Sequence, residues 1–112
     1  METYLAIDRL SALAHPARLA AFRLLIKAGP DGLPAGEIAR LTGVPPSTLS
    51  SQLAILERSG LTRSRRDGRS ILHAADYDAM NALVAYLAED CCAGAPAGCL
   101  PAAAFACGKA ST

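Results

Sequence analysis

The segment from residue 45 to residue 61, PPSTLSSQLAILERSGL, limits the possible fold of this chain more than any other. Leu49, Leu53 and Leu56 recur at the spacing of one helical face, which predicts a helix from about Pro46 to Ser59 that packs through this face. A glycine follows at once, as at the end of many helices. The opposite face carries small and hydroxyl side chains, whereas exposed helical faces usually favour Glu, Lys and Gln. Its members are Ser47, Ser51, Ala54 and Arg58, flanked by Thr48 and Ser50.

Shorter helices are predicted on the N-terminal side of this segment. The apolar spacing in residues 5–14 predicts a short helix, and Pro16 suits the first turn of a second helix that stops at Gly29. The composition of AGPDG (28–32) is typical of a turn. A third short helix is expected from Ala35 to Thr42, and TGVPPS then leads into the leucine-faced helix.

A β-hairpin and a last helix are predicted on the C-terminal side. Asp67-Gly68 is a two-residue turn signal, which predicts strands at about Leu61–Arg65 and Arg69–Ala74. Asp76 suits the N-cap of the last helix. Two short helices joined by a glycine-containing turn and followed by a hairpin make a winged helix-turn-helix, so the expected fold class is mainly α with a β-hairpin wing. The apolar stripe of the last helix contains Met80, Leu83, Val84 and Leu87.

The charge is distributed unevenly along the chain. The net charge is only +1, but residues 58–69 hold a run of arginines against the single acid Asp67, and residues 76–90 hold acids and no base. A basic patch in a neutral chain suggests a local anionic partner, although a solvated charged turn has the same composition.

The hydroxyl-faced helix and the basic hairpin together predict binding to double-stranded DNA. Short polar side chains let a helix approach base edges in the major groove, and wing arginines contact phosphates or the minor groove. Gln52 could pair with adenine, although it lies nearer the flank of the helix than its front. A helical domain with a serine-rich surface helix is the alternative without DNA. The predicted contacts are Ser47, Thr48, Ser50, Ser51, Gln52 and Arg58 on the helix, and Arg63, Arg65, Arg66 and Arg69 on the hairpin.

Length and composition set the remaining limits. At 112 residues the chain forms one small domain, expected over residues 1–92 with a tail at 93–112, and its limited core favours a dimer. The 52% hydrophobic but 4% aromatic composition favours helices. Glu2 and Asp8 argue against a signal peptide, and no apolar run is long enough for a membrane span, so a cytoplasmic protein without a membrane partner is expected. No catalytic constellation or phosphate loop occurs, so neither an enzyme nor a catalytic cofactor is expected.

Three stretches, LAHPARLAAFRLLIKAG, GEIARLTGVPPSTLSSQLAILERSGL and RSRRDGRSILH, resemble the ArsR/SmtB family of metal-responsive transcriptional repressors between Leu10 and Leu87. The resemblance implies a homodimer built through the first and last helices. It also implies an operator of inverted-repeat symmetry that is released when an inducer binds. Pro46 departs from the family, where many members have a polar base-reading residue, so base contact is expected to shift to Ser47 and Ser51.

The four cysteines follow the last predicted helix. The family's founding arsenic sensors have Cys-x-Cys before the recognition helix, but LPAGEIARL has no cysteine, and the last helix lacks the histidines of the family's zinc sensors. Thiolates are soft ligands that select thiophilic ions. The cluster resembles that of arsenite-responsive members with a C-terminal Cys-Cys…Cys site, which implies trivalent arsenic, and also antimony, as inducer. The implied ligands are Cys91, Cys92 and Cys99, with Cys107 as an extra ligand.

Other roles for these cysteines stay open. The thiols could sense oxidation or sulfane sulfur, or bind cadmium or lead with Cys107 as a fourth ligand. Cys91 also continues the apolar stripe and could be a packed small side chain. A thiol metal-buffering protein is the non-regulatory alternative, and a constitutive DNA-binding protein with incidental cysteines is another. His15 and His73 are expected to be structural.

Overall fold

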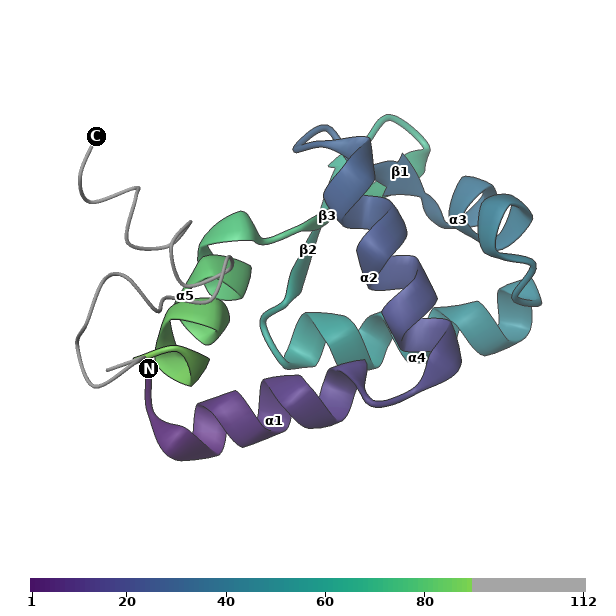
Figure 1. Ribbon diagram of the computed structural model, residues 1–112. Helices are drawn as coiled ribbons and strands as arrows, with labels where there is room; N and C mark the ends of the chain where they lie inside the picture. The colour runs from purple at the N-terminus through teal and green to yellow at the C-terminus, as the bar shows by residue number, and fades with distance from the viewer. Residues whose placement is uncertain (90–112) are drawn as a thin grey trace.

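The computed structural model describes residues 1–89, so the predicted tail and all four cysteines lie outside the described residues. Figure 1 shows the helices gathered around a small sheet. The elements are α1 (Thr3–Leu13), α2 (Pro16–Ala28), β1 (Leu33–Pro34), α3 (Ala35–Thr42), α4 (Pro46–Arg58), β2 (Thr62–Asp67), β3 (Ser70–Ala75) and α5 (Tyr77–Leu87).

The expected starts of α2 and α5 are confirmed by their caps. Pro16 occupies the first turn of α2, and the His15 ring Nδ1 accepts a hydrogen bond of 3.1 Å from the backbone N–H of Ala17. At α5, the Asp76 carboxylate accepts a bond of 3.0 Å from the N–H of Ala79. Side chains that satisfy the free N–H groups of a first turn fix where a helix begins.

The sheet has the antiparallel order β1-β3-β2, and β1 was not expected from the sequence. Leu33 lies opposite His73 and Pro34 opposite Leu72, so β3 is paired on both sides. The hairpin also turns one residue later than predicted, because Asp67 pairs with Ser70. Side chains alternate between the two faces along each strand, and this alternation decides where the wing side chains point.

The core forms around the leucine stripe of α4, as predicted. Leu49, Leu53 and Leu56 are buried against Phe22 and Leu25 of α2. Figure 1 shows α1 running beneath α2 and beside α4, with α5 next to the start of α1. The buried face of α4 therefore fixes the direction of its opposite, hydroxyl-bearing face.

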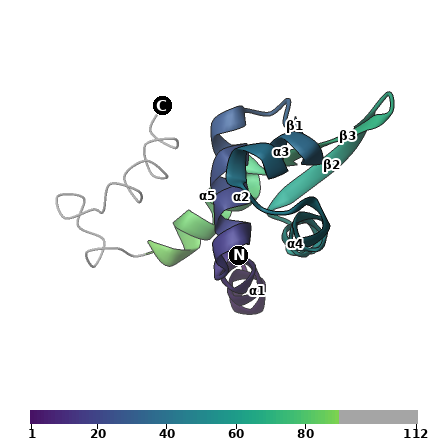
Figure 2. The ribbon, with the colours of Figure 1, turned by 90° about the vertical axis from the view of Figure 1, so that its right-hand side faces the viewer.

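The arrangement is a winged helix-turn-helix, as the sequence predicted. Figure 2 shows the β2–β3 hairpin projecting on the same side as α4, away from α5. Over residues 1–89, none of the helices is both long and apolar enough to cross a membrane.

Candidate nucleic-acid interface

The outward face of α4 is open to solvent. Ser47, Thr48, Ser50 and Ser51 are all exposed, and the Ser51 hydroxyl donates a 2.9 Å hydrogen bond to the backbone carbonyl of Thr48. Arg58 is exposed near the C-terminal end of the same helix. The predicted helix contacts, apart from Gln52, therefore lie at the surface of one helix whose back is anchored in the core.

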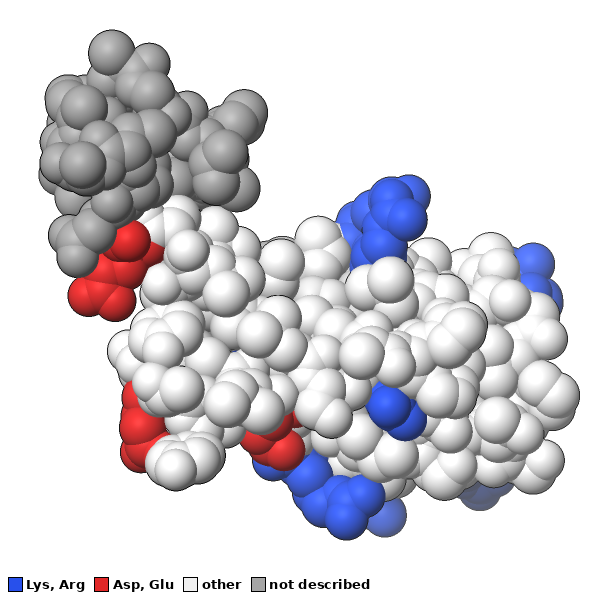
Figure 3. All heavy atoms as spheres, turned by 60° about the horizontal axis from the view of Figure 1, so that its bottom comes forward, with Lys and Arg blue, Asp and Glu red and all other residues white. Residues whose placement is uncertain are grey.

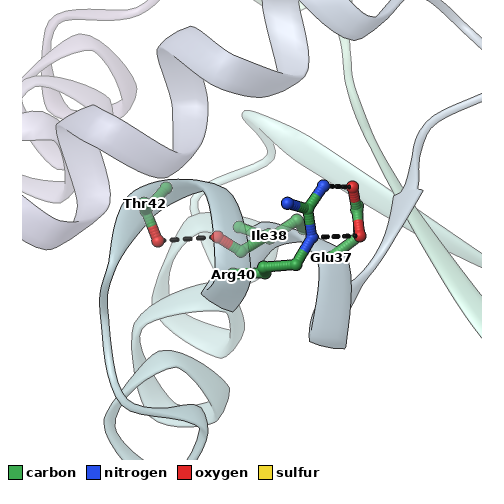
Figure 4. A network of polar contacts seen from close by, with 4 residues as sticks. All are labelled: Glu37, Ile38, Arg40 and Thr42. Atoms are coloured by element: carbon green, nitrogen blue, oxygen red, sulfur yellow. Dashed lines mark hydrogen bonds and ion pairs between the residues drawn. The ribbon is translucent and has the colours of Figure 1, made fainter.

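Contacts within α3 shape the turn that leads into α4 (Figure 4). The Thr42 hydroxyl donates a 2.7 Å bond to the carbonyl of Ile38 and accepts one of 3.3 Å from the N–H of Val44. On the outer side of α3, Arg40 forms an ion pair with Glu37. The hydrogen bonds from Arg40 lower the pKa of the Glu37 carboxyl and raise the pKa of Arg40. The Arg40 charge is thus partly neutralised next to the turn that leads into α4.

Gln52 lies on the flank of α4 and is already engaged. Its side-chain oxygen accepts a 2.7 Å hydrogen bond from Nη1 of Arg18, which belongs to α2. Pairing with adenine would require that same oxygen as an acceptor. The bond from Arg18 uses one of the two lone pairs of that oxygen and fixes its direction, which limits how Gln52 can turn toward a base.

A groove of about 460 Å³ separates α4 from the hairpin. Ser50, Ala54 and Glu57 line its α4 side, and Ser64 and Arg69 line its hairpin side. Ser64 and Arg66 belong to the same face of β2 because they are two residues apart in a strand. The structure therefore places Arg66 and Arg69 on the side of the hairpin that α4 shares.

Arg63 and Arg65 occupy the opposite face of the hairpin. They line a separate hollow together with Pro30 and Tyr77. Nη2 of Arg65 donates a 3.2 Å bond to the carbonyl of Asp31, and Nε of Arg63 lies 3.6 Å from the carboxylate of Asp76. The four predicted wing arginines are thus divided between two surfaces.

His73 is held at the back of the α4–hairpin groove. Within the described part of the chain, its buried Nδ1 has no hydrogen-bond partner. Burial lowers the pKa of the imidazole, and the nearby Glu57 charge only partly opposes this. A neutral imidazole in the middle strand agrees with the structural role expected from the sequence.

The charged side chains are segregated on the face that carries α1 and α4. Figure 3 shows the acidic side chains gathered toward the end where α1 starts and α5 ends, and separate basic side chains scattered over the rest of that otherwise mostly uncharged face. A surface divided in this way orients the molecule in the field of a polyanion.

The division of the wing arginines gives a first prediction. Arg66→Ala and Arg69→Ala should each weaken binding to promoter DNA by roughly 5–10-fold, because each is expected to remove a phosphate contact. Each should also reduce the slope of log affinity against log salt concentration by about one. Arg63→Ala and Arg65→Ala are the matched controls and should change both quantities little. Fluorescence anisotropy at several salt concentrations measures these effects. Equal losses in all four variants would contradict the division.

Metal ligands do not cluster in the described part of the chain. Among residues 1–89, no group of three His, Cys, Asp or Glu side chains could hold a metal ion. The predicted ligands Cys91, Cys92, Cys99 and Cys107 lie outside those residues.

Comparison with known proteins agrees with this geometry. Residues 13–65 match the family described as a helix-turn-helix domain. The HTH-type transcriptional regulator YgaV of Escherichia coli K12 is 39% identical over 83 residues, which cover 74% of this chain and 82% of that protein.

Solved structures give the same result. The transcriptional repressor BigR of Xylella fastidiosa is 29% identical with a TM-score of 0.59, and the match covers 77% of this chain and 85% of that one. A homodimeric winged helix-turn-helix DNA-binding domain from Mycobacterium bovis, described as a "possible ArsR-family transcriptional regulator", is 29% identical with a TM-score of 0.63. That match covers 78% of this chain and 81% of the domain. These relatives are named as regulators of transcription or DNA-binding domains, and such proteins are not enzymes.

Proposed function

The chain belongs to the helix-turn-helix transcriptional regulators of the ArsR type, and from this premise we propose that it is a dimeric repressor released from its operator by trivalent arsenic. The observation that carries the DNA-binding part of the proposal is the exposed hydroxyl face of α4 beside the arginines of the hairpin. A protein that only buffers metal ions has no use for such a face.

Operator binding follows from the two surfaces together. The short side chains of Ser47, Ser50 and Ser51 allow the backbone of α4 to approach base edges in the major groove. Arg66 and Arg69 would then reach the phosphates or the minor groove beside it and supply much of the affinity.

The dimer is supported by apolar side chains on α1 and α5. Tyr4, Ile7 and Leu87 are 79%, 55% and 59% exposed. The two helices are joined by a 2.7 Å hydrogen bond between the hydroxyls of Thr3 and Tyr86. Exposed apolar patches of this kind mark interaction sites, and a twofold partner would cover this one and give the operator inverted-repeat symmetry.

Inducer binding is assigned to the cysteines that follow α5 in the sequence. Cys91, Cys92 and Cys99 can supply three soft thiolates, the ligand type that thiophilic trivalent arsenic or antimony prefers, with Cys107 as a further thiol. Release of DNA requires the inducer to favour the DNA-free state. A coupling free energy of about 1–3 kcal/mol would weaken operator binding roughly 5–150-fold. α5 precedes the site directly, so a change there would reach the proposed dimer interface.

The test is fluorescence anisotropy of the reduced protein on its own promoter DNA, titrated separately with arsenite, cadmium and a polysulfide. Arsenite should release the wild type, whereas Cys91→Ser and Cys99→Ser should stay bound at the same arsenite concentration. Cys107→Ser is the matched control and should respond almost as the wild type does. Release by polysulfide alone would make the cysteines a sulfur or redox sensor, and release by cadmium alone would make them a cadmium site. Release by none of the three would contradict an inducible repressor.

A further inference from the structure

Arg18 joins three helices with one side chain. Its Nε donates a 2.6 Å hydrogen bond to the carbonyl of Ala12, near the C-terminal end of α1. Its Nη1 donates the 2.7 Å bond to the side-chain oxygen of Gln52, in the middle of α4. Arg18 itself lies in the first turn of α2 and is partly buried. Helix α4 is thereby bonded to the end of α1 through a single guanidinium group.

Arg9 makes a second connection between the same two helices. Its Nε donates a 3.0 Å bond to the carbonyl of Ser59, the residue that caps the C-terminal end of α4. A side chain at Gly60 would interfere, because a Cβ placed there would lie 2.8 Å from Nη2 of Arg9. The glycine that ends α4 thus also admits the guanidinium group.

The bonds to Ala12 and Ser59 satisfy backbone carbonyls at the C-terminal ends of α1 and α4, where a helix leaves its carbonyls free. The ends carry partial negative charge, so a guanidinium group there forms a charge-assisted bond. Through Arg18 and Gln52, α4 is attached to the end of α1 at the middle of α4, and through Arg9 and Ser59 it is attached at its C-terminal end. Two separated attachments restrict both sliding of α4 along α1 and rotation of α4 about its own axis.

We propose that Arg9 and Arg18, together the arginine clamp, are positioning residues for operator binding. They connect the helix that faces DNA with the helix that carries Tyr4 and Ile7 of the proposed dimer surface. Figure 1 shows α1 and α4 lying side by side, as their contacts require. The clamp therefore sets the separation and tilt of the two recognition helices in the dimer. This inference rests on the proposed function, because it needs a dimer that binds two half-sites.

The test compares a complete operator with a half-operator. The wild-type protein selects an inverted repeat from random double-stranded DNA, and one arm is then scrambled to leave a single half-site. Arg18→Ala should bind the complete operator about 10-fold more weakly but the half-site within about 2-fold of the wild type, because only simultaneous engagement of two sites depends on their geometry. Arg23→Ala, an exposed arginine on the same helix, is the matched control and should leave both affinities unchanged.

A second variant separates the clamp from base recognition and from folding. Gln52→Ala removes the acceptor on α4 but leaves the bond from Arg18 to Ala12 in place, so it remains informative if Arg18→Ala does not fold. If Gln52 acts through its bond to Arg18, Gln52→Ala and the double variant Arg18→Ala/Gln52→Ala should each bind the complete operator about 10-fold more weakly than the wild type, since the effects of residues in one network are not additive. Arg9→Ala should likewise lose affinity for the complete operator while keeping its affinity for the half-site.

The outcomes distinguish the clamp from the function on which it rests. Selection of no inverted repeat by the wild type would contradict the proposed function itself. Selection of a repeat that Arg18→Ala and Gln52→Ala bind as tightly as the wild type would overturn the clamp alone. An equal loss of affinity for the half-site and the complete operator would also overturn the clamp. So would a change in Gln52→Ala that is confined to recognition of one base pair, because Gln52 would then act by touching DNA.

Discussion

Ser51→Glu is expected to weaken operator binding by at least about 100-fold, because like charges brought together at an interface cost several kcal/mol. Ser51 is exposed in the middle of the α4 face, where a carboxylate would meet base edges and phosphates. The fold should be unaffected, since Glu is a better helix former than Ser and the lost hydroxyl bond to the Thr48 carbonyl is exposed. Fluorescence anisotropy on promoter DNA measures the affinity, and a thermal melt of the same sample measures the stability of the fold.

Ala20→Glu is the control for this prediction. It adds the same charge at an exposed position of α2, so it changes the net charge without changing the α4 face. Its affinity should stay within a few-fold of the wild type, as long-range repulsion is screened at physiological salt. Equal affinities of Ser51→Glu and the wild type would mean that the hydroxyl face of α4 does not lie against DNA.

The helices could be predicted because their signals are local. The leucine stripe of α4, the proline in the first turn of α2 and the N-cap Asp76 each act within one or two helical turns, and the structure has all three where the sequence places them. The hydroxyl face of α4 follows from the same periodicity. Its direction required only that the leucines be buried.

The pairings could not be predicted because their partners are distant in the sequence. β1 is two residues long and contains Pro34, so no alternation marks it, and it is a strand only because β3 lies beside it. The hairpin register is fixed by the burial of Thr62 and by pairing along β3, whereas Asp67-Gly68 alone allows more than one turn position. The alternation of side chains along β2 then places Arg63 and Arg65 on one face of the hairpin and Arg66 on the other.

The Gln52 contact was missed for the same reason. A helical projection places Gln52 on the flank of α4, but nothing within that helix shows what the flank meets. Its partner Arg18 is 34 residues away in the sequence and becomes a neighbour only when α2 crosses α4. Local periodicity therefore predicted the hydroxyl face of α4, and only tertiary contacts identified what holds that face in place.

The close pairing of β1 with β3 makes Gly32 the position where a single methyl group should do most damage. Gly32 has a φ of +76°, in the left-handed region that side chains disfavour. A Cβ there would lie 2.3 Å from the carbonyl oxygen of His73 and 3.2 Å from Cβ of Ala74. The first of these neighbours is backbone of the central strand, which cannot yield without separating β1 from β3.

Gly32→Ala should therefore lower the free energy of unfolding by about 3 kcal/mol, the sum of left-handed strain and overpacking. For a domain of this size that corresponds to a fall in melting temperature of roughly 10–25 °C, measured at constant protein concentration because the proposed dimerisation would contribute to stability. Gly36→Ala is the matched control: it lies in the first turn of α3, and apart from its chain neighbours and the backbone of its own helix, no atom of the described residues comes within 4 Å of its added Cβ. Since alanine favours a helix more than glycine does, this variant should be as stable as the wild type or slightly more so. If Gly32→Ala melted at the same temperature as Gly36→Ala, β1 could not be in close contact with β3. The position of the hairpin beside α4 would then need another explanation than its pairing with β1.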